Sequence, residues 1–487
     1  MNNLNIFCAG LCLILVSCTS KLDPDIALIE TIENNLLPAV IVEGEEGDGF
    51  NILDRMEHYK VPGLSIAFLN EGRIKWARGY GHTSADSLRV VDENTLFQAA
   101  SISKPVAAMA ALSLVEEGKI GLDENVNRYL KGWQVEENKF TREEKVTLRR
   151  ILSHSAGLTV HGFGGYASDE EVPDIVQVLN GEEPANSGRI FPDNTPGLQY
   201  SYSGGGYTIM QKMLCDVSGK TFPDLMEEAV LSKIEMYSSS YEQPLREDLW
   251  GRAASGHDAS GKMIEGRWHT YPEMAAAGLW TRPTDLLKYA MEVQKSYKGE
   301  SNLIITQEMT EKMLTPQLNN HGLGPGVGGS GDSITFSHGG SNAGFRCNLY
   351  AFTKLGQGVA IMTNGDRGGE LMSEILRSFS RAYNWDIYKP DIKTIVSLDD
   401  EVLSSLTGKY SLTYQDRDLI VEITVEENHL KGVQEWNDLT FEIYPESKSK
   451  FFNKDDGTVF EFSFDENKVV SGITIYEGSQ EYLFEKI

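Results

Sequence analysis

Apolar and polar residues alternate in two short runs near the start of the chain and in three runs more than 200 residues later. The stretch 63–81 predicts two strands around an Asn-Glu-Gly turn, and strands return at 333–340, 345–353 and 358–364. Between them, from about 120 to 295, apolar residues recur mostly at helical spacing. The pattern therefore predicts one sheet built from both ends of a domain, with a helical insertion between them.

Other stretches predict helices at 50–61, 97–119 and about 369–383. After Pro390 the pattern changes to short alternating runs at regular intervals, which is typical of an all-β domain. We therefore expect an α/β (α+β) domain over 49–390, with an antiparallel sheet flanked by helices plus a helical subdomain. A small β-barrel or sandwich domain is expected over 395–487.

The first residues have the features of an export signal. An uncharged apolar run covers 6–16, which is too short to span a bilayer and has the length of a signal-peptide core. It ends in Leu-Val-Ser-Cys, which resembles the lipobox of bacterial lipoproteins, in which the cysteine (here Cys18) carries the lipid. We expect a signal peptide over 1–17, a flexible tether over 18–48, and a lipoprotein of the cell envelope, periplasmic or surface-facing. The alternative is an ordinary cleaved signal.

Composition excludes some partners. The chain has 487 residues and a formal charge of -27, which argues against nucleic acid or an anionic membrane surface as a partner. Cys215 and Cys347 are too few for a disulfide framework, so both are expected to be buried, unpaired thiols. The chain contains no CxxC or HExxH spacing, so we expect no metal and no other cofactor.

Ser101 and Lys104 mark the start of the helix expected at 97–119. One serine is explained as a helix cap, but a lysine is unfavourable at the positive end of the helix dipole. Residues three apart are neighbours on a helix, so the pair also fits a serine nucleophile with an amine that accepts its proton. A cap with a solvated lysine is the competing interpretation.

Further segments narrow the choice between these interpretations. Tyr202-Ser203-Gly204 lies about 100 residues downstream in an expected Gly/Ser-rich loop before a helix, and His338-Gly339-Gly340 lies on an expected strand. Together with "LRRILSHSAGLTV" and "GLWTRPTDLLKY", this order resembles the serine β-lactamase and penicillin-binding-protein superfamily, in its class C-like serine hydrolase branch. The resemblance covers roughly residues 45–390. The β domain is similar to one appended to many such hydrolases.

The resemblance implies a role for each matching residue. Ser101 corresponds to the acyl-forming nucleophile, Lys104 to its proton-transfer partner, and Tyr202 to the tyrosine that acts as general base or proton shuttle. Tyr200 and Tyr207 offer competing alignments for Tyr202. His338-Gly339-Gly340 stands in place of Lys-Thr-Gly, as in esterase and peptidase relatives. The main-chain N–H groups of Ser101 and Ser341 would then form the oxyanion hole.

Two departures bear on specificity. Gly204 occupies the place of the asparagine in Tyr-x-Asn, and His338 with Gly339 replaces a lysine and a threonine that hold the carboxylate of β-lactams. With an ordinary histidine pKa of about 6.5, His338 would bind anionic β-lactams better as the pH falls. His154 is expected to hold a loop by hydrogen bonds.

The implied function is a lipid-anchored serine hydrolase that cleaves an ester or amide through an acyl-enzyme on Ser101. A D-amino-acid peptide is one such substrate. The partner is then a small-molecule, peptide or cell-wall-derived substrate, and the membrane is reached only through the lipid. A true β-lactamase and a non-catalytic envelope lipoprotein are the alternatives. The substrate, the oligomeric state and the role of the β domain stay open.

Overall fold

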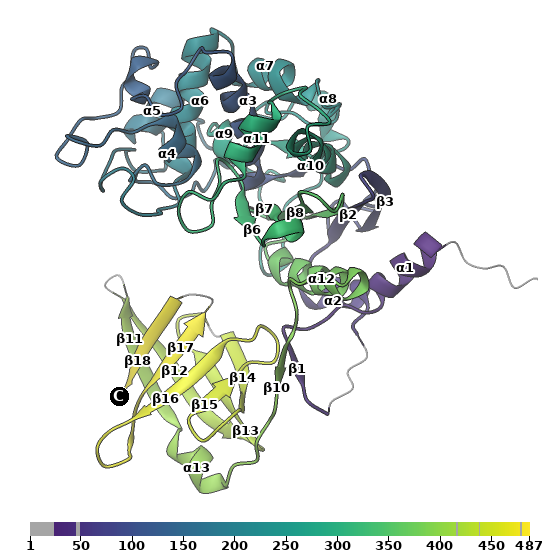
Figure 1. The fold of residues 1–487 in the computed structure, drawn as a ribbon. Helices are drawn as coiled ribbons and strands as arrows, with labels where there is room; N and C mark the ends of the chain where they lie inside the picture. The colour runs from purple at the N-terminus through teal and green to yellow at the C-terminus, as the bar shows by residue number, and fades with distance from the viewer. Residues whose placement is uncertain (1–23, 45–48, 415–416, 438, 478–479) are drawn as a thin grey trace, which may run out of the picture.

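The computed structural model describes residues 24–44, 49–414, 417–437, 439–477 and 480–487. The proposed signal peptide and Cys18 lie outside these residues. Figure 1 shows a mixed α/β domain and, connected to it through β10 (Asp391–Lys393), a barrel at the C-terminal end. Both parts of the predicted fold class are confirmed, and the C-terminal part is a barrel rather than a sandwich.

A six-stranded antiparallel sheet forms the centre of the α/β domain, in the order β3-β2-β9-β8-β7-β6. The strands are β2 (Gly63–Asn70), β3 (Arg73–Gly81), β6 (Gly326–Gly328), β7 (Thr335–Asn342), β8 (Phe345–Phe352) and β9 (Gly358–Thr363). β2, from the start of the domain, pairs directly with β9, from its end, so the sheet is built from both ends of the domain as predicted.

Both faces of this sheet are buried. In β2, Leu64, Ile66 and Phe68 point into one core. Ala67 and Leu69, which alternate with them, point into the other core. The first core is closed by α1 (Pro24–Glu33), α2 (Ile52–His58) and α12 (Gly368–Tyr383). The second is the larger core and contains the helical region.

The helical region and its short elements lie between β3 and β6. Its helices are α3 (Ser103–Glu116), α4 (Leu148–Leu152), α5 (Ile175–Asn180), α6 (Gly204–Ser218), α7 (Phe222–Met226), α8 (Glu247–Trp250), α9 (Met274–Ala277), α10 (Pro283–Tyr297) and α11 (Gln307–Met313). A two-stranded sheet joins β4 (Phe97–Gln98) to β5 (Trp280–Thr281), and short 3-10 or π turns are η1 (Ala100–Ile102), η2 (Val126–Arg128) and η3 (Glu227–Leu231). A further 3-10 turn, η4 (Gly331–Ser333), lies outside this region, between β6 and β7.

The barrel is closed, and all its neighbouring strands are antiparallel. Its strands are β11 (Gly408–Tyr414), β12 (Arg417–Glu426), β13 (His429–Gln434), β14 (Leu439–Pro445), β15 (Lys450–Phe452), β16 (Val459–Phe464), β17 (Val470–Glu477) and β18 (Gln480–Lys486). A short helix, α13 (Asp400–Ser405), precedes it. The apolar pattern did not predict β15 or β18.

The described part of the expected tether is folded, which corrects that expectation for residues 24–44. Ile29 and Ile32 of α1 and the following Leu36 are at most 4% exposed, because they pack on the α/β domain. After this segment, β1 (Val40–Val42) pairs in parallel with β10, and its valines pack against Phe452 of the barrel. Apolar residues among the acidic ones therefore order the segment and bring it against the barrel.

Candidate active site

Ser101 lies in η1, the 3-10 turn that leads into α3, and is partly exposed. The regular helix begins only at Ser103, and no side chain caps it, so the interpretation of Ser101 as a cap is wrong. Ala100, directly before it, has a left-handed backbone with φ of 48°, which costs a non-glycine residue on the order of 1–2 kcal/mol. The nucleophile candidate is thus held in a strained turn.

Lys104 is only 2% exposed, which excludes a solvated lysine. Its Nζ donates to Ser101 Oγ at 3.0 Å and to the carbonyl oxygen of Ala276 at 2.8 Å. Burial lowers the pKa of Lys104 to about 7, because desolvation disfavours the charged amine. Near neutral pH a large share of the molecules therefore carries an uncharged amine that can take the proton of Ser101.

Tyr202 lies next to Ser101 and Lys104. Lys104 Nζ lies 5.0 Å from the centre of its ring. Burial raises the pKa of Tyr202 to about 12, although hydrogen bonding with Ser101 partly offsets this effect. The phenol is therefore protonated at neutral pH, which makes Tyr202 a proton donor or shuttle rather than a standing base. The competing Tyr200 instead packs beside His321, with 5.7 Å between ring centres.

His338 lies near Tyr202, with 6.3 Å between their ring centres. Its Nδ1 donates to the carbonyl oxygen of Gly339 at 2.6 Å. Burial, and secondly the charge of Lys104, lower the pKa of His338 to about 3. An imidazole with this pKa is neutral throughout pH 5–8, which argues against the expected improvement in binding of anionic β-lactams with falling pH. That expectation assumed a solvated histidine.

Gly339, Gly340 and Ser341 continue β7 beside η1. Gly340 is buried at the contact, whereas Gly339 and Ser341 are exposed. A Cβ atom on Gly340 would lie 2.3 Å from the carbonyl oxygen of Ala99 and 2.4 Å from Cys347 Sγ. The missing side chain therefore allows the segment before Ser101 to pack directly on the strand.

Replacing Gly340 by alanine is expected to lower the free energy of unfolding by about 2–3 kcal/mol, because the new methyl group overfills this contact. Gly339→Ala is the matched control, since a Cβ atom there has its nearest neighbour, the carbonyl oxygen of Cys347, at 3.9 Å. It should change stability by no more than about 0.5 kcal/mol. Urea unfolding of both variants measures the difference, and equal effects would contradict the packing argument.

Several neighbours of the site were not predicted from the sequence. Ser103 Oγ donates to Ala100 O at 2.6 Å and accepts from the N–H of Leu279 at 2.9 Å. These bonds fix η1 against the residue that precedes β5. Tyr241 OH donates to the carbonyl oxygen of Ser103 at 2.7 Å. His321 lies near His338, with ring centres 6.3 Å apart, and burial lowers its pKa to about 4. None of these residues stands at a fixed distance from Ser101 in the sequence that a known motif would reveal.

His154 and Gly204 hold the segment that carries Tyr202. The N–H of Ser203 donates to His154 Nδ1 at 3.1 Å, which confirms the predicted loop-holding role of His154. Gly204–Gly206 form the first turn of α6, capped by Ser203, so the expected Gly/Ser-rich loop at 203–206 is wrong. A Cβ atom on Gly204 would meet Phe163 at 3.0 Å and the carbonyl oxygen of His161 at 3.3 Å. The tight packing favours a residue without a side chain here.

The order of these groups agrees with a known family. The family model described as Beta-lactamase matches residues 51–377. The chain belongs to the β-lactamase family. Members of this family, which also includes penicillin-binding proteins and amidases, are generally serine hydrolases. The family match spans the α/β domain from α2 to α12 and contains Ser101, Lys104, Tyr202 and His338.

Curated relatives of this β-lactamase-family protein are distant. A penicillin-binding protein of Bacillus subtilis (strain 168) is 23% identical over 439 residues, covering 84% of this chain and 92% of the relative. Protein flp of Staphylococcus aureus (strain MRSA252) is 23% identical over 265 residues, covering 50% of each chain. The chain thus spans half the length of protein flp and nearly all of the B. subtilis protein.

Solved structures share the fold. The octameric penicillin-binding protein homologue from Pyrococcus abyssi has a TM-score of 0.61 and 20% identity, covering 89% of this chain and 98% of that one. D-amino acid amidase from Ochrobactrum anthropi SV3 has a TM-score of 0.56 and 17% identity, covering 73% of this chain and 99% of that one. In the described part of this chain, no helix is long and apolar enough to cross a membrane.

Proposed function

We propose that the protein is a lipid-anchored serine hydrolase of the cell envelope that cleaves an ester or amide through an acyl-enzyme on Ser101. The observation that carries the proposal is the buried amine of Lys104, with Nζ 3.0 Å from Ser101 Oγ and a pKa of about 7. A serine becomes a nucleophile when a neighbouring group can take its proton at the moment of attack. The anchor rests on the sequence around Cys18, and the mass of residue 18 in protein isolated from membranes tests it.

In the proposed reaction, Ser101 Oγ forms a bond to the substrate carbonyl carbon while its proton passes to Lys104 Nζ. The negative charge on the former carbonyl oxygen is held by the main-chain N–H groups of Ser101 and Ser341. The bond to the leaving alcohol or amine then breaks, and Tyr202 donates its phenolic proton to that group and regains one from Lys104. Water hydrolyses the acyl-enzyme by the same transfers in reverse.

The substrate class follows from what two positions of β7 lack. His338 is neutral and Gly339 has no hydroxyl group, so these two positions offer neither the cation nor the hydroxyl of the Lys-Thr pair that holds a carboxylate. This favours neutral esters and amides over penicillins. A D-amino-acid amide or peptide is a member of that class, and the fold shared with a D-amino acid amidase supports including it.

Active-site labelling tests the proposal. A fluorophosphonate probe should modify Ser101 in the full-length wild type, as located by peptide mass mapping, and should fail to modify Ser101→Ala. Ser341→Ala is the matched control, because its proposed contribution is a main-chain N–H group that alanine retains. It should still be labelled. An unlabelled wild type, or label on a residue other than Ser101, would refute the acyl-enzyme and favour the non-catalytic envelope lipoprotein.

A further inference from the structure

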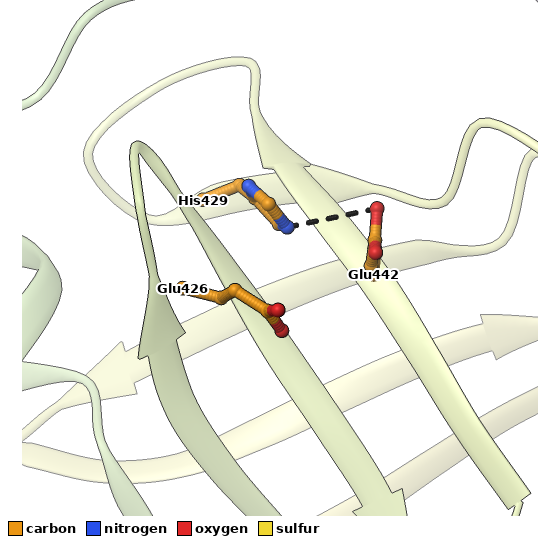
Figure 2. Close-up of side chains that lie close together, drawn as sticks. All are labelled: Glu426, His429 and Glu442. Carbon is orange, nitrogen blue, oxygen red and sulfur yellow. Dashed lines mark ion pairs between the residues drawn. The ribbon is translucent and has the colours of Figure 1, made fainter.

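Three potential metal ligands meet on the outer face of the barrel, away from the groups around Ser101. Glu426 ends β12, His429 begins β13, and Glu442 lies on β14 (Figure 2). Glu426 and His429 are directly paired across the first two strands. Leu430 and Ile443, the immediate neighbours of His429 and Glu442, point into the barrel core, so these two side chains point outward.

The distance between His429 and Glu442 is that of two neighbouring ligands of one ion rather than that of a hydrogen-bonded pair. His429 Nε2 and Glu442 Oε2 are 3.6 Å apart, and one ligand atom from each of the three residues lies within 4.8 Å of the others. At 3.6 Å the pair is too far apart for a hydrogen bond. Two ligands of a tetrahedral Zn²⁺ with bonds of about 2.1 Å are about 3.4 Å apart. His429 and Glu442 therefore already have about the separation that two ligands of the same Zn²⁺ ion require.

One atom of the cluster lacks a hydrogen-bond partner among the described residues. His429 Nε2 is shielded from solvent and makes no hydrogen bond, whereas Glu426 Oε2 forms an ion pair with Lys431. The His429 side chain as a whole is only 13% exposed. A shielded imidazole nitrogen without a donor or acceptor is costly in a folded protein, and a bound cation would remove that cost.

Neighbouring groups hold two of the ligands in place. Tyr444 OH donates to Glu442 Oε2 at 2.6 Å, and the ring of Tyr444 stacks on that of His429 with 4.7 Å between centres. Such hydrogen bonds and packing around the ligands orient metal sites in proteins. A cavity of about 310 Å³, lined among others by Lys431, Glu442 and Tyr444, opens beside the cluster.

Lys431 forms an ion pair with one of the carboxylates. Its Nζ lies 3.1 Å from Glu426 Oε2, and both side chains are about 40% exposed. Exposed pairs of this kind contribute little to stability, so a divalent ion with an imidazole ligand can displace the lysine. Lys431 therefore weakens metal binding without preventing it.

We propose that Glu426, His429 and Glu442 form a Zn²⁺ site on the barrel, with solvent as the fourth ligand. One imidazole and two carboxylates are a ligand set that Zn²⁺ accepts, and three protein ligands leave one position for water. The site is independent of the proposed chemistry at Ser101. The sequence search for metal motifs missed it because the ligands come from three strands and have no short fixed spacing.

Calorimetric titration of the full-length protein with ZnCl₂ tests the site. The wild type should bind Zn²⁺ with a component that His429→Gln and Glu442→Gln each weaken by at least about tenfold. Glu435→Gln is the matched control, because it removes the same charge from the barrel but from a residue paired with Lys409. Its affinity should equal that of the wild type. Lys431→Gln should bind more tightly, because the competing cation is gone.

Cobalt spectroscopy separates this site from the other histidines. His429 is the only histidine after residue 390, so a visible absorption band of bound Co²⁺ that disappears in His429→Gln reports on the barrel. Melting curves without metal show whether each variant is folded. Equal Zn²⁺ affinity in the wild type and His429→Gln, or no binding component lost in either ligand variant, would overturn the proposal.

Discussion

Replacing Lys104 by methionine is expected to lower kcat/KM for a p-nitrophenyl ester by about two to four orders of magnitude, the range that general-base groups contribute. Methionine has a similar shape but cannot accept the proton of Ser101. The folded state should not suffer, because the wild type already buries an amine that is only 2% exposed and whose pKa burial lowers to about 7. The melting temperature of Lys104→Met should therefore equal or exceed that of the wild type.

The pH profile makes this prediction specific. The uncharged amine is the active form, so kcat/KM of the wild type should rise with pH up to about 7 and then level off. Lys104→Met should lose this rise. Lys212→Met is the matched control, since Lys212 is also a helical lysine with a 12% exposed side chain but pairs with Asp216. A Lys104→Met variant with more than about a tenth of wild-type activity would assign the proton transfer elsewhere.

The residues that could be predicted from the sequence are those with local or ordered spacing. Ser101 and Lys104 are three residues apart at the start of a helix, and the structure joins them by a hydrogen bond. The strands of the central sheet could be predicted from their apolar runs. β2, for example, is buried on both faces, so apolar side chains follow one another along it. The order and register of the strands within the sheet come from the structure.

Other features depend on tertiary contacts that the sequence does not reveal. The pKa of His338 depends on burial beside Lys104, and neither is visible in the sequence around residue 338. The triple glycine of α6 predicts a loop because glycine disfavours helices, yet a Cβ atom on Gly204 would lie 3.0 Å from Phe163, so tertiary packing favours glycine in this helical turn. In the segment 24–44, Leu36 is buried in a stretch whose acidic composition predicted a tether.

Glu273 is a buried carboxyl group with a large expected effect on stability. It is 0% exposed, and neither carboxylate oxygen has a hydrogen-bond partner among the described residues. Burial raises its pKa from 4.5 to about 8. The carbonyl oxygen of the same residue accepts from the N–H of Ala276 at 3.0 Å, so its backbone supports the turn that carries the carbonyl partner of Lys104.

The direction of the pH effect follows from proton binding. Between pH 4.5 and about 8 the folded protein keeps a proton on Glu273 that the unfolded chain has lost. Folding stability therefore falls as pH rises through this window, by up to about 1.4 kcal/mol per pH unit, and levels off above it. The total is on the order of 3–5 kcal/mol.

Glu273→Gln should abolish this contribution, because the amide has nearly the same shape and does not ionise. The free energy of unfolding of the variant should equal that of the wild type at pH 4.5 and should exceed it by a growing margin toward pH 8. Urea unfolding followed by tryptophan fluorescence measures it, since six of the seven tryptophans precede residue 390 and so report on the α/β domain. Glu265→Gln, at an exposed position, is the control and should leave the pH dependence unchanged. Parallel curves for the wild type and Glu273→Gln would mean that Glu273 does not retain its proton in the folded protein.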